Sequence, residues 1–318
     1  KKVIQQAEKQ EVAREILIAL RARLVPIPQA ENVSIESIPS QQQLSSLLEC
    51  YKNGQFDDAE KLATSITQEF PKHPFSWKVL GALLEQTGRK FEALNANQNA
   101  VALSPQDAEA HYNLGVILKE LGRLEEAEKS YTQAIALKPD YAEAYNNLGA
   151  TLQELGRFEE AEASYRQAIS MKMDYAEAHN NLGVVLQALG RLEKAEASYR
   201  RAIKKKHDYA EAHRNLSTMK RYHSRDKQYS KMQEIYFDKS VSEEQRCHIN
   251  FGLAKACEDL EDFKQAFKHY SEGNSIRKKL LGYDISQDIK MFKQLKISYS
   301  RIEQKSLEPD NLRNKPVP

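Results

Sequence analysis

The chain has few cysteines, no long apolar run and little net charge. Its three cysteines are scattered and odd in number, which argues against a disulfide framework or a zinc site and favours a reduced, cytoplasmic compartment. No apolar run approaches the roughly 18 residues of a membrane-spanning helix. A net charge of +2 gives no general attraction to nucleic acid or to an acidic membrane. We therefore expect neither a membrane nor a nucleic acid as partner.

The motifs of common catalytic sites are also missing. The sequence contains no Gly-rich phosphate loop, no HExxH, no GxSxG and no CxxC. His111, His179 and His213 recur at multiples of 34 residues, which invites interpretation as metal ligands. Trp77 and Tyr145 hold the same position in other copies, so we expect these histidines to pack. No catalytic residue, metal or cofactor is expected, and this chain is not predicted to be an enzyme.

What the sequence does contain is a 34-residue unit in tandem. Three copies follow one another from Ala108 to Tyr209, beginning AEAHYNLGVILKELGRLEEAEKSY, AEAYNNLGATLQELGRFEEAEASY and AEAHNNLGVVLQALGRLEKAEASY. A fixed period of this length predicts a stack of similar supersecondary units in place of one globular core.

The glycines of the unit indicate a pair of antiparallel helices. Gly115, Gly149 and Gly183 interrupt an apolar helical pattern, where glycine costs roughly 1 kcal/mol relative to alanine. Close approach of a neighbouring helix would offset that cost. Gly122, in a Leu-Gly-Arg step, suits the left-handed position that ends a helix, and Pro139 marks the boundary with the next unit.

This pattern resembles the tetratricopeptide repeat, in which an aromatic, a Leu-Gly step, a turn glycine, two alanines and a terminal proline recur every 34 residues. The resemblance is greatest to the superhelix-forming repeats found beside protein-modifying transferase domains, because an asparagine precedes each Leu-Gly step. It implies an all-α fold, a right-handed superhelix (α-solenoid) of stacked helix pairs. It also implies the general function of a scaffold for protein-protein interaction.

The period divides the chain into three predicted parts. Residues 1–39 contain an amphipathic helix to about Leu24 and a linker; the helix either caps the first repeat or lies in the groove of its own or a neighbouring chain. Residues 40–223 form the superhelix, with repeats at 40–73, 74–107, 108–141, 142–175 and 176–209 and a partial repeat at 210–223. Residues 224–318 form an irregular helical segment, with a degenerate repeat at 247–280 and a final helix over about 285–305.

The C-terminal third carries a second resemblance. Residues 215–318 resemble the segment that joins tetratricopeptide repeats to the catalytic domain of bacterial sulfotransferases, most clearly at Gly273-Asn274, Arg277 and Tyr283-Asp284. In that family the catalytic domain opens just after a Lys-Pro-hydrophobic-Pro step, which here is Lys315 to Pro318. The resemblance implies that this chain is the substrate-recruiting arm of a sulfotransferase whose catalytic domain lies beyond it.

A row of asparagines is the candidate binding site. The row occupies one position of the first helix in successive repeats and consists of Asn113, Asn147, Asn181 and Asn215. An amide both donates and accepts hydrogen bonds, so such a row could pair with the backbone of an extended peptide. Alternatively, the asparagines serve helix packing. The family resemblance adds neighbouring groove positions, which are Tyr112, Asn146, Asn180 and Arg214.

The sequence also bears on partners other than an extended peptide. Capture of a C-terminal carboxylate needs basic and amide side chains on two helices; Lys78 is present, but Ala82 and Glu143 stand where further partners are needed. The basic residues between Lys204 and Lys231 are expected to be a solvated helix surface; the alternatives are docking of an acidic partner, of a nucleic acid or of the face of a missing domain. A third hypothesis is a homo-oligomer, built through the groove or through residues 1–24.

Overall fold

The protein is described by a computed structural model, which covers residues 38–286 and 288–296. The predicted helix at residues 1–24 and the end of the final predicted helix, residues 297–305, lie outside the described residues. Residues 285–286 and 288–296, which belong to that final helix, are helical.

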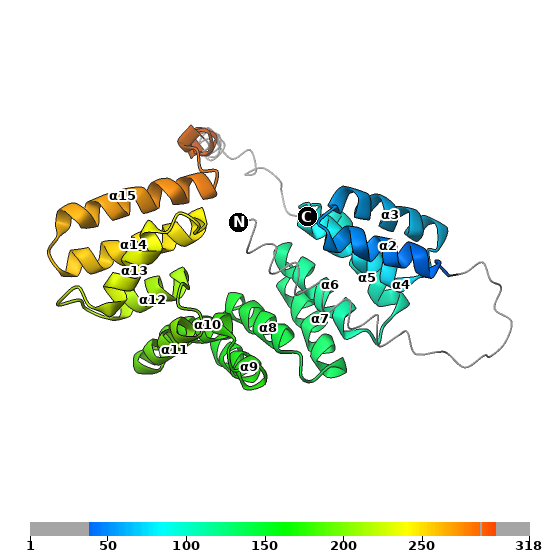
Figure 1. Ribbon diagram of the computed structural model, residues 1–318, viewed down its shortest axis with the longest axis horizontal. Coiled ribbons are helices and arrows are strands. Elements are labelled where there is room, and N and C mark those ends of the chain that lie inside the picture. Colours follow the sequence, from blue (N-terminus) through cyan, green and yellow to red (C-terminus); the bar gives the residue numbers. More distant parts are fainter. Residues whose placement is uncertain (1–37, 287, 297–318) are drawn as a thin grey trace, which may run out of the picture. The chain divides into compact units, whose positions relative to one another are not determined.

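All regular structure within the described residues is helical, and these residues contain no strand (Figure 1). The helices are α2 (Gln41–Lys52), α3 (Phe56–Glu69), α4 (Pro74–Gln86), α5 (Lys90–Leu103), α6 (Ala108–Glu120), α7 (Leu124–Leu137), α8 (Ala142–Glu154), α9 (Phe158–Met171), α10 (Ala176–Ala188), α11 (Leu192–Lys205), α12 (Ala210–Met219), α13 (Lys227–Phe237), α14 (Glu243–Asp259) and α15 (Phe263–Leu280). The expected all-α, right-handed solenoid is confirmed.

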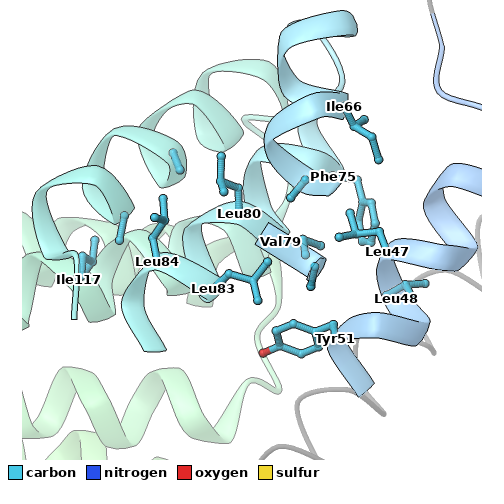
Figure 2. Packing of buried hydrophobic residues seen from close by; sticks show 14 residues of the cluster. Leu47, Leu48, Tyr51, Ile66, Phe75, Val79, Leu80, Leu83, Leu84 and Ile117 are labelled. Carbon is cyan, nitrogen blue, oxygen red and sulfur yellow. The ribbon is translucent and has the colours of Figure 1, made fainter. Parts of the chain in front are cut away.

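The helices fall into two compact units, the first ending at Met219 and the second beginning at Lys220. In the first unit, helices pair as α2–α3, α4–α5, α6–α7, α8–α9 and α10–α11, and α12 packs on α11. The buried core of the stack consists of several clusters, and partly buried leucines such as Leu114 and Leu148 pack against two of them at once. Figure 2 shows its first part, in which Tyr51 of α2, Val79 of α4 and Ile117 of α6 belong to one cluster.

Each regular pair is held at close range by a glycine opposite a tyrosine ring. A Cβ atom added to Gly115, Gly149 or Gly183 would lie 2.7, 2.8 or 2.5 Å from the nearest ring atom of a tyrosine on the second helix. These rings, of Tyr131, Tyr165 and Tyr199, are almost fully buried. The predicted close approach is therefore confirmed, and the approaching group is a side chain.

The turn glycines have the predicted left-handed backbone. The φ angles are 73° at Gly122, 76° at Gly156 and 71° at Gly190. Each turn N–H also bonds back to the first helix, as from Gly122 N to Lys119 O at 2.9 Å. The connection between the helices of a pair is thus short and the same in each copy.

The second unit repeats this design with substitutions. Helix α14 packs along α15, and the turn between them contains Glu261 with a φ angle of 60° where the regular repeats have glycine. This left-handed backbone is strained at Glu261, because a residue with a Cβ atom pays roughly 1–2 kcal/mol for it.

The start of α14 is fixed by Ser242, which forms a capping box. In it, the side chains of Ser242 and Gln245 each accept the other residue's backbone N–H.

The glycine opposite the tyrosine ring leads to a first prediction. Gly149→Ala should lower the free energy of unfolding by about 1–3 kcal/mol, because its methyl group would overlap the buried ring of Tyr165. Urea unfolding followed by circular dichroism measures this change. Helix propensity alone predicts the opposite sign, so an unchanged or raised urea midpoint would contradict the packing argument. In the double variant with Tyr165→Leu, the two losses should be less than additive.

The strained turn leads to a second prediction. Glu261→Gly should stabilise the second unit by about 1 kcal/mol, because glycine adopts the left-handed backbone without a Cβ clash. Hydrogen exchange of the α14 and α15 amides measures the effect within that unit. The matched control is Lys264→Gly at an exposed position in the first turn of α15, which should lose stability. Equal effects of the two glycines would refute the explanation.

Candidate functional site

The first helices of the repeats form the inner surface of the first unit. Helices α4, α6, α8 and α10 each contact the next first helix along the stack, and α12 is the last of the row. Within residues 41–205, no comparable contact joins the successive second helices. A stack that is closer on one side curves toward that side, so the first helices line the concave surface (Figure 1).

A cavity of about 200 Å³ lies on this surface between α2, α4 and α6. Its lining residues are Tyr51, Lys78, Val79, Ala82, Glu85, Gln86, Glu109, Tyr112, Asn113 and Val116. Of the residues predicted from the sequence, Tyr112 and Asn113 line it. Lys78 and Val79 occupy the same repeat positions as Tyr112 and Asn113, one period earlier.

The lysine in this lining is fully paired. Lys78 is only 6% exposed, and its Nζ donates to Asp107 Oδ2 at 3.1 Å and to a carboxylate oxygen of Glu109. Burial would raise the pKa of Asp107, but Lys78 and the N–H groups of Glu109 and Ala110 hold that pKa below its ordinary value. Lys78 therefore joins α4 to α6, and its charge is already compensated within the protein.

Glu85 is a carboxylate without such a partner. No described residue forms a hydrogen bond or an ion pair with its side chain, and the nearby Lys90 pairs with Glu120 at 3.2 Å. Burial raises the pKa of Glu85 to about 7; the charge of Glu120 raises it further, and Lys90 opposes the shift. A share of the molecules therefore carries a proton on Glu85 near neutral pH.

Two tyrosines form rigid walls of the cavity. The hydroxyl of Tyr51 accepts a hydrogen bond from Gln86 Nε2 at 2.9 Å, and burial raises the pKa of this tyrosine to about 12. The ring of Tyr112 packs against the Tyr141 ring with centroids 4.9 Å apart. These contacts fix the aromatic faces before any ligand arrives.

Three members of the asparagine row, Asn147, Asn181 and Asn215, join their repeat to the one before it. The side-chain amide of Asn147 donates to Tyr112 Oη at 3.0 Å, that of Asn181 to Asn146 Oδ1 at 3.2 Å, and that of Asn215 to Asn180 Oδ1 at 3.0 Å. The packing role that the sequence left open is therefore observed. Pairing with a peptide backbone stays a prediction.

The predicted groove residues differ in burial. Asn146, Asn180 and Asn215 are 1%, 0% and 7% exposed, so these amides lie within the helix stack. The others are partly exposed, namely Tyr112, Asn113, Asn147, Asn181 and Arg214. Arg214 donates to Asn215 Oδ1 at 2.9 Å, which places its guanidinium beside the end of the row. The surface available to a ligand thus belongs to the partly exposed residues.

Sequence reasoning missed five lining residues. They are Tyr51, Val79, Glu85, Gln86 and Glu109. A signal for two of them was present, because Lys78, Ala82, Glu85 and Gln86 follow the i, i+4, i+7, i+8 spacing of one helix face. The asparagine row begins only at Asn113, one repeat later, so it did not point to these residues of α4.

The recurring histidines are held by packing and by main-chain hydrogen bonds. His111 Nε2 lies 3.0 Å from Pro105 O, and His213 Nε2 lies 3.0 Å from His207 O. His179 is buried, which lowers its pKa. The described residues contain no group of three or more His, Cys, Asp or Glu side chains that could hold a metal ion.

Some of the basic residues between Lys204 and Lys231 are exposed, and others form ion pairs. Lys204, Lys205 and Lys206 are exposed at the end of α11. In the second unit, Lys220 pairs with Asp226, and Arg225 pairs with Asp262 at 3.0 Å.

Among the helices within residues 38–286 and 288–296, none has the length and apolar character that crossing a membrane requires.

Comparison with family models identifies the repeats. Models of the tetratricopeptide repeat match residues 84–122, 106–174 and 140–205. Residues 84–205 of the chain thus contain tetratricopeptide repeats, as the 34-residue period indicated. The search of curated proteins found no match.

Solved structures show the same fold. PilF of Pseudomonas aeruginosa is 20% identical, with 69% of this chain and 96% of that chain covered and a TM-score of 0.51. MamA (residues 41 to the end) of Desulfovibrio magneticus RS-1 is 16% identical, with coverage of 55% and 98% and a TM-score of 0.50. The Cut9–Hcn1 hetero-tetramer of the APC/C gives 16% identity, coverage of 72% and 45% and a TM-score of 0.58. At these identities the likeness concerns the fold alone.

The unpaired carboxylate leads to a third prediction. Because the folded-state pKa of Glu85 lies above its ordinary 4.5, the folded protein keeps a proton that the unfolded chain loses. The contribution of Glu85 to the free energy of unfolding therefore falls as pH rises from about 4.5 to about 7.

Glu85→Gln removes this dependence. It should exceed the parent in the free energy of unfolding by about 1–2 kcal/mol at pH 8, with a smaller difference at pH 5. Thermal unfolding at both pH values and constant salt measures this. The exposed Glu125→Gln on α7 serves as control and should show no such trend. A difference that does not grow with pH would show that Glu85 is adequately solvated.

Proposed function

We propose that this chain is a protein-interaction module that binds an extended peptide segment of a partner protein on the inner surface of its first unit. The observation that supports this most is the cavity between α2, α4 and α6, which draws its lining from three successive repeats. A ligand that fills it would contact all three first helices at once.

The asparagine row supports binding along the same surface. Asn147 and Asn181 each use their amide nitrogen in a bond between repeats, and their Oδ1 atoms accept no hydrogen bond from the described residues. These oxygens can accept N–H groups of a peptide backbone. Each such bond contributes roughly 0.5–1.5 kcal/mol, which a flexible peptide largely offsets by its loss of conformational entropy. The row therefore supports weak, sequence-tolerant binding, and selectivity must come from the cavity.

The structure affects how the proposal is tested. Replacing the asparagines by alanine would also remove bonds between repeats, so a loss of binding would have two explanations. Ala82→Trp, which fills the cavity from α4, avoids this problem. The matched control is Ala136→Trp at an exposed position on α7.

The experiment is selection of a random decapeptide library on the immobilised full chain. The parent and Ala136→Trp should enrich peptides above blank beads, whereas Ala82→Trp should lose at least about tenfold of the recovered peptide. Equal recovery by both tryptophan variants would contradict binding at the cavity. No enrichment by the parent would contradict peptide binding.

Two further hypotheses stay predictions. The sulfotransferase arm rests on the resemblance of residues 215–318, which lie beyond the matched repeat models. It requires that the native reading frame continue into a Pro-Arg-Ser-Gly-Thr phosphosulfate loop. The homo-oligomer is tested by the molecular mass in solution with and without residues 1–39.

A further inference from the structure

The cavity between α2, α4 and α6 has an excess of negative charge. One cation, Lys78, and two carboxylates, Glu85 and Glu109, line it, which leaves a net charge of −1 when all three are ionised. Lys78 already forms ion pairs with Glu109 and with Asp107, and Asp107 is not part of the cavity lining. Glu85 is thus the lining charge that forms no ion pair with any of the described residues.

The surroundings of Glu85 favour the arrival of a cation. Loss of hydration on burial and the negative charge of Glu120 both raise the pKa of the Glu85 carboxyl group, to about 7. Lys90, which opposes this shift, is held by Glu120 at 3.2 Å. A cation brought into the cavity would replace part of the lost hydration and relieve the repulsion.

The shape and walls of the cavity fit a single side chain. A volume of about 200 Å³ is below the roughly 300–1,000 Å³ of a typical small-molecule pocket. Tyr51 and Tyr112 supply aromatic faces, which attract ammonium and guanidinium groups. Val79, Ala82 and Val116 supply apolar surface for an aliphatic stem.

We propose that this cavity binds a lysine or arginine side chain of the partner peptide, with the Glu85 carboxylate as counter-ion. The stem of that side chain lies against Val79, Ala82 and Val116, and its charged end donates hydrogen bonds to Glu85. The inference rests on the proposed function, since it names the chemistry of the ligand at the same surface. It makes the module selective for basic peptide segments although the protein itself is slightly basic, with a net charge of +2.

The first test is the decapeptide selection repeated at pH 7.5 with three full-length chains: the parent, Glu85→Gln and the exposed control Glu125→Gln. Peptides recovered by the parent and by Glu125→Gln should be enriched at least about threefold in lysine or arginine at one position. Glu85→Gln should recover peptides without that enrichment. Circular dichroism should show that all three chains are equally helical.

The second test is a double-mutant cycle on one selected peptide. Its basic residue is replaced by the uncharged norleucine for lysine, or citrulline for arginine, and Kd is measured by calorimetry. Either change alone, in the peptide or as Glu85→Gln, should weaken binding about tenfold, as expected for a partly buried charge pair. The two changes together should cost no more than either one.

The outcomes separate the two proposals. If the parent enriches peptides without a basic residue, or with an acidic one, the cationic ligand is refuted and peptide binding stands. Additive losses in the cycle would likewise show that the basic residue binds elsewhere. If the parent enriches no peptide at all, peptide binding and the cationic ligand are both refuted.

Discussion

The contact between a glycine of the first helix and a tyrosine ring of the second sets the geometry of each regular repeat. With a Cβ at Gly115, Gly149 or Gly183, the ring could not occupy its position, and the helices would have to separate. The contact recurs in three successive repeats, so the same crossing geometry recurs as well. Since each pair then presents the same surfaces to the next, a regular superhelix with a defined inner surface follows.

The preceding repeat shows how far this contact can vary. There Asn97 meets Gly81, and its amide turns back to bond Ala93 O at 3.0 Å. Among the described residues, the buried Oδ1 of Asn97 accepts no hydrogen bond, which is a cost that Tyr165 and Tyr199 avoid because their hydroxyls donate to Gln153 and Gln187. In the second unit, a Cβ atom added to Gly273 would lie 3.3 Å from the Cβ of Asn250, so glycine again permits close packing with a different neighbour.

Polar bonds between repeats lie on both sides of the stack and differ in strength. On the inner side, the asparagine row joins first helices through bonds that are partly or fully buried. On the side of the second helices, Arg157 binds Glu128 of the preceding repeat at 2.8 Å, but its side chain is 40% exposed, so solvent screens much of that attraction. The inner bonds therefore hold the repeats in register more firmly. Asn147 and Asn181 are also partly exposed on this inner side, so amides that join the repeats stay accessible from the surface.

Much of this architecture follows from the sequence alone. The 34-residue period determined the paired helices, the left-handed turn at Gly122 and the close approach at Gly149, because each depends on residues within one repeat.

Other features were decided only by the tertiary structure. The amide of Asn147 reaches Tyr112 on the preceding first helix, a contact that depends on how two repeats stack. The raised pKa of Glu85 arises because α2 and α6 bury a carboxylate of α4 beside Glu120. Local pattern reveals a helix face, but the burial, partners and net charge of a side chain are set by the neighbours that folding places around it.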